Sequence, residues 1–155
     1  MFAGIILAMM MMIQVPKAPK VEAFNEMLAI RKIQVSKPIE PEEIISDEEF
    51  ELLCRCVEAE AGDQGYLGKV YVTDCILNRC DAWEKSITEI IYQKHQFEVV
   101  SNNRINKVEV TEETKKAVSD ELRSRTRYDI LHFRMDYYHS FGTPVFSYKD
   151  HYFSR

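Results

Sequence analysis

A glutamate at the end of an apolar helical stripe is the residue of this sequence best placed to do chemistry. The stripe consists of Leu53, Cys56, Val57 and Glu60. These positions are spaced i, i+3, i+4 and i+7, so they share one face of a helix. Burial of that face and the negative end of the helix dipole both disfavour an ionised Glu60. The pattern predicts a general acid, with an ordinary surface glutamate at a helix end as the alternative.

Capping signals and periodicity predict mostly helical surroundings for Glu60. Ser46 with Glu49 forms a capping box that begins a helix ending at Gly62. Further helices are expected at 66–79, 86–92 and 111–125. Aromatic and β-branched residues predict short strands or turns within 130–135, 145–148 and 151–153. The predicted fold class is α+β, mostly helical, with a small C-terminal β element.

The first 44 residues differ in composition from the rest of the 155-residue chain. Residues 1–15 are apolar and are interpreted as an export signal or anchor, although a membrane span needs about 20 apolar residues. A misassigned start or a buried core helix are the alternatives. Residues 16–44 carry prolines and charges and are interpreted as a linker. The catalytic domain is expected at 45–155.

Overall composition favours a globular protein and argues against nucleic acid as the main partner. Hydrophobic residues make up 46% and charged residues 29%, and the formal net charge is −5. Binding to phosphates needs a basic surface instead. We expect a monomer without a cofactor or metal. The four cysteines are Cys54, Cys56, Cys75 and Cys80. Their spacing is unusual for zinc, so free thiols are favoured over a disulfide or a metal site.

The segment 92–104 mixes aromatic, amide and histidine side chains without a clear period. Amides can bind sugar hydroxyl and N-acetyl groups, and aromatic rings can pack on sugar faces. This composition suits carbohydrate recognition, and an ordinary polar loop is an equal alternative. Trp83, Tyr137 and Tyr138 are expected to serve in packing rather than as sugar platforms.

Several blocks in order resemble the cell wall hydrolase family of the SleB/CwlJ type, the spore-cortex-lytic enzymes and their relatives. They are EAEAGDQGYLGKVYVTDCILNR, IYQKHQFEVVSNNR, TEET and YHSFGTPVFSYKDHYFS. The resemblance runs from Ser46 to Arg155. It implies a compact fold similar to lysozymes and lytic transglycosylases, and cleavage of the β-1,4 bond between N-acetylmuramic acid and N-acetylglucosamine in peptidoglycan.

The resemblance also implies individual site residues. The family's catalytic glutamate lies eight residues before a glycine, which matches Glu60 and Gly68. This chain departs from the members that read E-A-R-G-E, since it lacks the second glutamate of that block. The matching blocks implicate four residues in substrate binding, namely Gln96, Phe97, His151 and Tyr152.

No second carboxylate stands out beside Glu60. Glu58 should point away from Glu60 on the helix, Asp63 should be solvated, and Asp74 could equally serve a structural hydrogen bond. One lone carboxyl fits the lytic transglycosylases, in which the same group acts as acid and then as base. A hydrolytic muramidase of the lysozyme type is the alternative.

Two further functions are carried as alternatives. One is a cysteine peptidase or amidase acting on peptide stems, with Cys56, Cys75 or Cys80 as nucleophile and His132 or His151 as base. The other is a wall-binding domain without catalysis. The expected location is secreted or at the cell envelope, with possible membrane association through residues 2–13.

Overall fold

The computed structural model describes residues 44–155. Its elements are α2 (Asp47–Ala61), α3 (Gly65–Trp83), α4 (Ile87–Ile91), α5 (Glu98–Ser101), η2 (Arg104–Asn106), α6 (Glu112–Arg123), β1 (His132–Met135), β2 (Pro144–Tyr148) and β3 (His151–Ser154). The predicted class is confirmed: helices predominate and a small sheet follows them. The segment 1–15, and all but the last residue of the segment 16–44, lie outside the described residues. Within 44–155, no helix is both long and apolar enough to cross a membrane.

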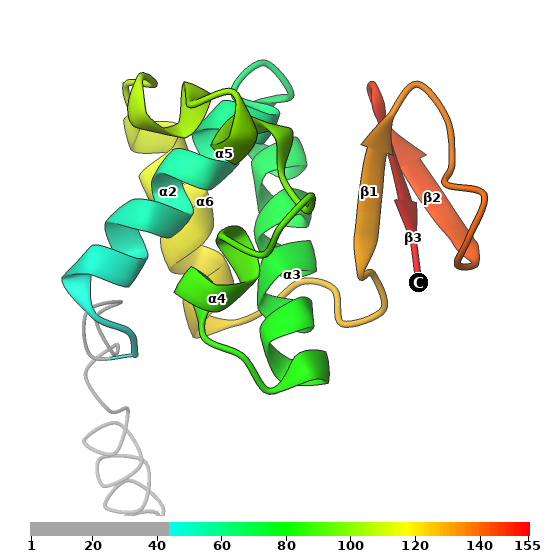
Figure 1. Cartoon of the computed structure of the whole chain (residues 1–155), viewed down its shortest axis with the longest axis horizontal. Helices are drawn as coiled ribbons and strands as arrows, with labels where there is room; N and C mark the ends of the chain where they lie inside the picture. The colour runs from blue at the N-terminus through cyan, green and yellow to red at the C-terminus, as the bar shows by residue number, and fades with distance from the viewer. Residues whose placement is uncertain (1–43) are drawn as a thin grey trace, which may run out of the picture. The chain divides into compact units, whose positions relative to one another are not determined.

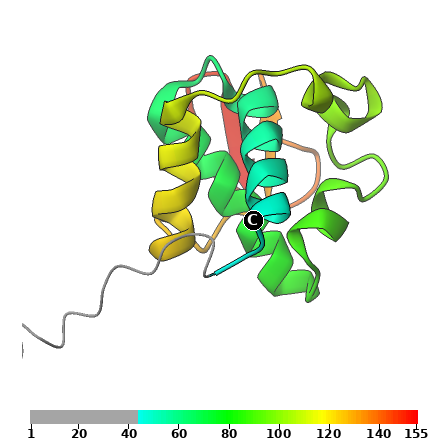
Figure 2. The ribbon, with the colours of Figure 1, turned by 90° about the vertical axis from the view of Figure 1, so that its left-hand side faces the viewer.

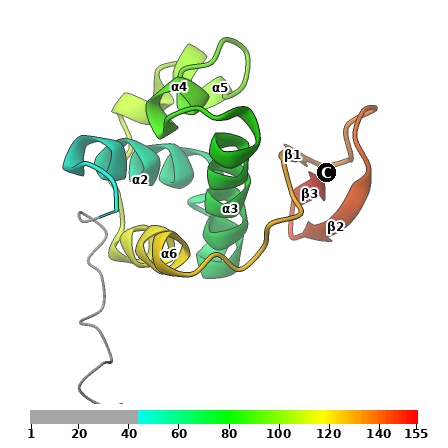
Figure 3. The same ribbon diagram turned by 90° about the horizontal axis from the view of Figure 1, so that it is seen from below.

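Helix α3 lies at the centre of the domain. The other helices pack on one side of it and the sheet lies on the other, as Figures 1 and 3 show. Helix α2 contacts α3 and also lies between α6 and the segment that carries α4 and α5 (Figure 2). The last turn of α2 is therefore surrounded by elements from three separate parts of the sequence.

The predicted C-terminal boundary of α3 was wrong. The helix was expected to close at Arg79, but it continues to Trp83 and stops where Glu84 takes a left-handed conformation with φ 52°. Nothing between these residues breaks a helix, since the stretch contains neither glycine nor proline. The predicted end of α2 is confirmed, since Gly62 is its C-cap. Gly62 has a right-handed conformation there, and the glycine with positive φ in the loop between α2 and α3 is Gly65, at φ +72°.

The segment 92–104 is more ordered than its composition suggested. It contains α5 and is followed directly by η2, which begins at Arg104. Both elements are a single turn, which is too short for a period of 3.6 to appear in the sequence. Their buried residues, Val99 and Ile105, join the core below α2.

The sheet is antiparallel with the order β1-β3-β2, so the last strand of the chain is the central one. His151 pairs with Met135 of β1 and with Tyr148 of β2. Alternation along β3 buries His151 and Phe153. Phe153 packs against Tyr71 of α3, with ring centroids 5.7 Å apart. Aromatic packing thus attaches the sheet to the central helix.

The connector between α6 and β1 is held by polar side chains from both helices. Asp74 accepts the amide of Arg127 at 2.9 Å, and Glu121 accepts the amide of Thr126 at 2.5 Å. Asn78 donates to the carbonyls of Arg127 and Ile130. Burial, and next the neighbouring Glu121 carboxyl, raise the pKa of Asp74 to about 9. Asp74 is therefore protonated at neutral pH.

This buried carboxyl should make the folded state sensitive to alkaline pH. The pKa of Asp74 rises from an ordinary 3.8 on folding. The contribution of this carboxyl to the free energy of unfolding is therefore fully present below pH 3.8 and is lost as the pH rises towards 9. We expect Asp74→Asn, which resembles the protonated form, to flatten the decline. The unmodified protein should lose on the order of 2 kcal/mol between pH 6 and pH 9 in urea unfolding.

The matched control is Glu109→Gln, which neutralises an exposed carboxylate. It should keep the pH dependence of the unmodified protein. An Asp74→Asn protein whose unfolding free energy declines with pH as steeply as that of the control would contradict a protonated Asp74.

Candidate active site

Glu60 lies in the last turn of α2, where two surface cavities meet. One has a volume of about 490 Å³ and the other about 260 Å³, and both are lined by Glu60 and Met135. The first cavity extends towards Arg79 and His151, and the second towards Asp63 and Arg104. A ligand that fills both would pass Glu60 on its way, as an extended polymer must in order to be cut internally.

Four parts of the chain form the larger cavity. Its lining residues are Glu60, Arg79, His95, Gln96, Glu98, Phe133, Arg134, Met135, Asp136, Tyr137, His139 and His151. They come from the ends of α2 and α3, from the segment around α5, and from the sheet with the loop between β1 and β2. Most are polar or aromatic, which suits a ligand rich in hydroxyl and amide groups.

The surroundings of Glu60 keep its carboxyl protonated to higher pH than usual. Its pKa is raised, first by burial and then by the neighbouring Glu98 carboxylate. The charge of Arg104, the backbone amide of Val99 and the charge of Arg79 act in the opposite direction. The direction predicted from the helical stripe is confirmed, and burial is the main cause.

The structure brings two of the four predicted substrate contacts to Glu60. Gln96 and His151 line the same cavity. Phe97 is buried beneath it, where its ring contacts Phe133 at a centroid distance of 6.3 Å. Tyr152 faces away from the buried side of β3 and packs on Tyr138, with ring centroids 5.0 Å apart.

Sequence reasoning missed several residues of the cavity, above all Arg79, Met135 and His139. In the sequence, Arg79 stands at the predicted end of a helix. Met135 lies in β1 and His139 in the loop after it, and the sequence does not show which side of the sheet these residues face. Tyr137 was expected to pack, but it lines the cavity and is 54% exposed, with the Arg134 guanidinium 3.8 Å from its ring centroid.

The carboxylates considered as partners of Glu60 lie elsewhere or serve the fold. Glu58 accepts hydrogen bonds from the backbone and hydroxyl of Thr111, at 3.0 and 2.8 Å, and so holds the N-cap residue of α6. Asp74 is held in the connector contact described above. Asp63 is exposed at the edge of the smaller cavity. The carboxylates that share the larger cavity with Glu60 are Glu98 and Asp136.

The cysteines are free thiols in an environment that suppresses reactivity. Burial raises the pKa of Cys75 and Cys80 to about 11, and raises the pKa of Cys56 well above its ordinary value. A nucleophilic cysteine needs the opposite shift, because the thiolate is the reactive form. The cysteine peptidase alternative therefore loses its nucleophile. Within residues 44–155, no three histidine, cysteine or acidic side chains are grouped to hold a metal ion.

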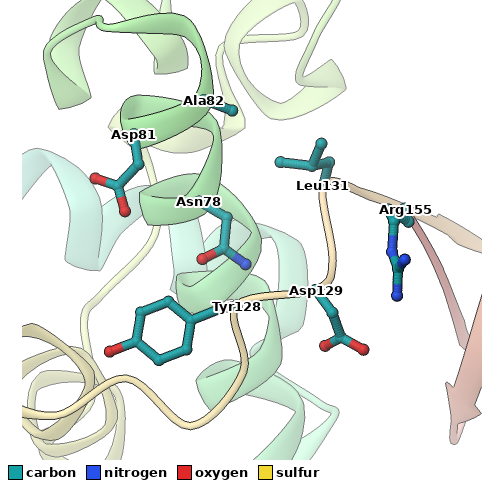
Figure 4. A pocket seen from close by; sticks show the side chains of 7 residues that line it. All are labelled: Asn78, Asp81, Ala82, Tyr128, Asp129, Leu131 and Arg155. Atoms are coloured by element: carbon teal, nitrogen blue, oxygen red, sulfur yellow. The ribbon is translucent and has the colours of Figure 1, made fainter.

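Another cavity of about 480 Å³ lies between α3 and the connector. Figure 4 shows its lining, which is Asn78, Asp81, Ala82, Tyr128, Asp129, Leu131 and Arg155. Its main polar groups already have partners in the protein. Asp81 pairs with Arg125, Asp129 pairs with Arg127 at 2.7 Å, and the Asn78 amide holds the connector. The Glu60 cavity is the better candidate, because polar groups there remain unused.

Residues 63–154 match the family model described as cell wall hydrolase. The match covers more than half of the chain. This chain belongs to the cell wall hydrolase family. The matched residues begin after Glu60, so the role of Glu60 rests on the geometry and on the sequence pattern. A comparison with curated protein sequences gave no match.

Two solved structures of SleB share the fold of this family member. One is the catalytic domain of the germination-specific lytic transglycosylase SleB from Bacillus anthracis, with 22% identity and a TM-score of 0.62 over 72% of this chain and 97% of that one. The other is the catalytic domain of the Bacillus cereus SleB protein, with 24% identity and a TM-score of 0.62 over 71% of this chain and 91% of that one.

The departure from the family's glutamate block has a structural role in this cell wall hydrolase. Gln64 is buried, and its amide nitrogen donates to Asp63 at 2.9 Å and to Asp150 at 3.2 Å. Its carbonyl oxygen accepts the amide of Asp150 at 3.3 Å. The side chain thus connects the loop before α3 to the turn between β2 and β3.

Arg104 should hold the pKa of Glu60 below the value that burial alone would impose. We expect Arg104→Gln to raise the pKa of Glu60, because the largest opposing charge is removed. NMR titration of the labelled Glu60 carboxyl carbon measures this without substrate. Lys107→Gln, which removes an exposed charge nearby, should have little effect. An unchanged or lower pKa of Glu60 in the Arg104→Gln protein would contradict the stabilisation of the Glu60 carboxylate by Arg104.

Proposed function

We propose that this cell wall hydrolase cleaves the glycan strand of peptidoglycan at the β-1,4 bond between N-acetylmuramic acid and N-acetylglucosamine. We propose further that it acts as a lytic transglycosylase, with Glu60 as acid and then as base. The observation that carries the proposal is a half-buried carboxyl of raised pKa at the junction of two cavities. Family membership supplies the substrate class.

The proposed reaction needs one carboxyl group and no water. Protonated Glu60 donates its proton to the glycosidic oxygen as the bond from that oxygen to C1 of N-acetylmuramic acid breaks. The Glu60 carboxylate then accepts the proton of the C6 hydroxyl while that oxygen forms a bond to C1. The products are a free 4-hydroxyl end and a 1,6-anhydro end, and Glu60 is protonated again.

The balance of charges around Glu60 suits a group that must act in both directions. Burial favours the protonated form that donates first. Arg104 and Arg79 stabilise the carboxylate that remains after donation. A glutamate with burial alone would donate its proton less readily in the first step, because its ionised form would lack nearby positive charge.

Hydrolysis by a muramidase route is the second candidate, and the position of Glu98 is the observation that favours it. This carboxylate lines the larger cavity with Glu60, so it could orient a water molecule. Its side chain is exposed, and its charge raises the pKa of Glu60. The lytic route requires no such partner.

The remaining expectations about the whole chain are part of the proposal. We propose that residues 45–155 form the catalytic domain and act at the cell envelope or outside the cell. The family's substrate supports that location. A membrane attachment through residues 2–13 and a monomeric state complete the proposed arrangement.

Glu60→Gln should reduce glycan cleavage by at least about 100-fold, because a general acid contributes roughly 10²- to 10⁴-fold. The fold should remain intact, since the amide is similar in shape to the protonated carboxyl. The measurement is mass spectrometry of fragments released from purified peptidoglycan, with circular dichroism to check the fold. Unmodified protein should release fragments with 1,6-anhydro ends.

Glu98→Gln is the matched control, because it neutralises a carboxylate of the same cavity. It should retain activity within a few-fold. Reducing ends on the fragments, together with loss of activity in Glu98→Gln, would replace the lytic route by hydrolysis. Full cleavage by Glu60→Gln would remove Glu60 from the mechanism.

A further inference from the structure

Arg79 is a buried cation that lacks a counter-ion in the described structure. Its side chain is 4% exposed and lines the larger cavity beside Glu60. Its Nε donates to the carbonyl of Leu131 at 2.5 Å, and its guanidinium lies 5.7 and 5.2 Å from the ring centroids of Trp83 and Phe97. No carboxylate within residues 44–155 forms an ion pair with it, and its Nη1 has no hydrogen-bond partner there.

The other buried cation of the same helix shows what a structural arrangement looks like. Lys69 is 2% exposed and pairs with Glu113 at 3.1 Å and with Glu58 at 3.7 Å. Burying a charge is costly unless it is paired and hydrogen-bonded. Arg79 is buried to a similar degree without such a pair, and it differs from Lys69 by lining a cavity that is open to a ligand.

A second unused polar group lines the same cavity. His151 is 1% exposed, and its Nδ1 has no hydrogen-bond partner among the described residues. As a neutral ring in the Nδ1–H tautomer, it offers one donor. Two buried donors without acceptors therefore border one cavity, and both would be satisfied by the oxygens of a single anionic group.

The other arginine of the cavity is already engaged. Arg134 donates to the Tyr137 hydroxyl and lies over its ring. No ion pair joins Glu60 and Arg79 in the described structure, and the protonated Glu60 that precedes proton donation leaves the Arg79 charge uncompensated. Arg79 is thus the guanidinium that remains for a ligand, and the planar donors of a guanidinium match the two oxygens of a carboxylate.

We propose that Arg79, assisted by His151, binds a carboxylate carried by the peptidoglycan strand in the cavity beside Glu60. This inference rests on the proposed function. N-Acetylmuramic acid differs from N-acetylglucosamine by a lactyl group that ends in a carboxyl, which is either free or joined to a peptide stem with carboxylates of its own. Binding of that anion would fix which sugar lies on each side of Glu60, so Arg79 determines specificity and strand register.

The test compares strands of equal length that differ in their carboxylates. The protein used is the full chain with the substitution Glu60→Gln, which prevents cleavage during the measurement. Binding is measured by isothermal titration calorimetry. The ligands are peptide-free strands with free lactyl carboxylates, the same strands after amidation, strands that retain their stems, and oligomers of N-acetylglucosamine. Charged hydrogen bonds predict an affinity for the preferred carboxylate strand about 10- to 100-fold above that for the N-acetylglucosamine oligomer.

The ligand series identifies the source of the carboxylate. Loss of affinity on amidation of the peptide-free strands assigns the lactyl group. Tight binding of stem-bearing strands alone assigns a carboxylate of the stem. Equal affinity for all four ligands overturns the proposal. This comparison requires no substitution at Arg79, so it stands even where an Arg79 variant fails to fold.

Arg79→Lys keeps the charge but loses the planar pair of donors, so discrimination between carboxylate and amidated strands should fall about tenfold or more. Arg134→Lys is the matched control from the same cavity and should retain the discrimination. A folded Arg79→Lys protein that discriminates as well as the control overturns the role of Arg79. Cleavage by the unmodified chain is assayed separately: cleavage without discrimination refutes this inference alone, and absence of cleavage refutes the proposed function.

Discussion

Helix α3 is buried on most of its surface, and the polar side chains that it carries into the interior constrain the rest of the domain. These buried residues are Lys69, Thr73, Asp74, Asn78 and Arg79. A buried polar group left without a partner costs about 1–3 kcal/mol, so the neighbouring elements must supply partners. Helix α6 supplies Glu113 to Lys69, and the connector supplies its backbone to Asp74, Asn78 and Arg79, while the Thr73 hydroxyl donates to the Lys69 carbonyl within α3 itself.

The active-site cavity is a consequence of this constraint. The hydrogen bond from Arg79 to the carbonyl of Leu131 holds the chain just before β1 begins, and aromatic contacts to Tyr71 attach the remaining strands. Strand β1 and the loop that follows it are thereby positioned across from the last turn of α2. Glu60 then occupies the space between a helix end and a sheet, where it is half-buried yet reachable by a ligand.

Buried ionisable groups in this domain fall into two kinds with different consequences. Lys69 and Glu58 have their partners inside the protein and support α6. Glu60, Arg79 and His151 border the cavity, and each carries a pKa shift, an unpaired charge or an unused donor there. Lys69 and Glu58 stabilise the fold through their mutual contacts, whereas Glu60, Arg79 and His151 can still form interactions with a substrate.

The sequence by itself determined the main helices, the C-terminal strands and the special position of Glu60. Caps and hydrophobic periods act between residues a few positions apart, so they are visible in one dimension. The raised pKa of Glu60 followed from the same local pattern, since the stripe that holds it had to be buried. The resemblance to cell wall hydrolases, now supported by the family match, rested on ordered blocks of residues.

Only the tertiary structure decided which residues meet Glu60. His151 and Tyr152 are neighbours on β3, so His151 lines the cavity while Tyr152 faces the other side of the sheet. Because both side chains are aromatic, the alternation of residue types in the sequence could not show which of them faces inward. The tertiary structure likewise decided that Phe97 is buried in the core and that Arg79 lines the cavity. Burial, unpaired charge and cavity shape depend on groups distant in sequence, and packing alone brings those groups together.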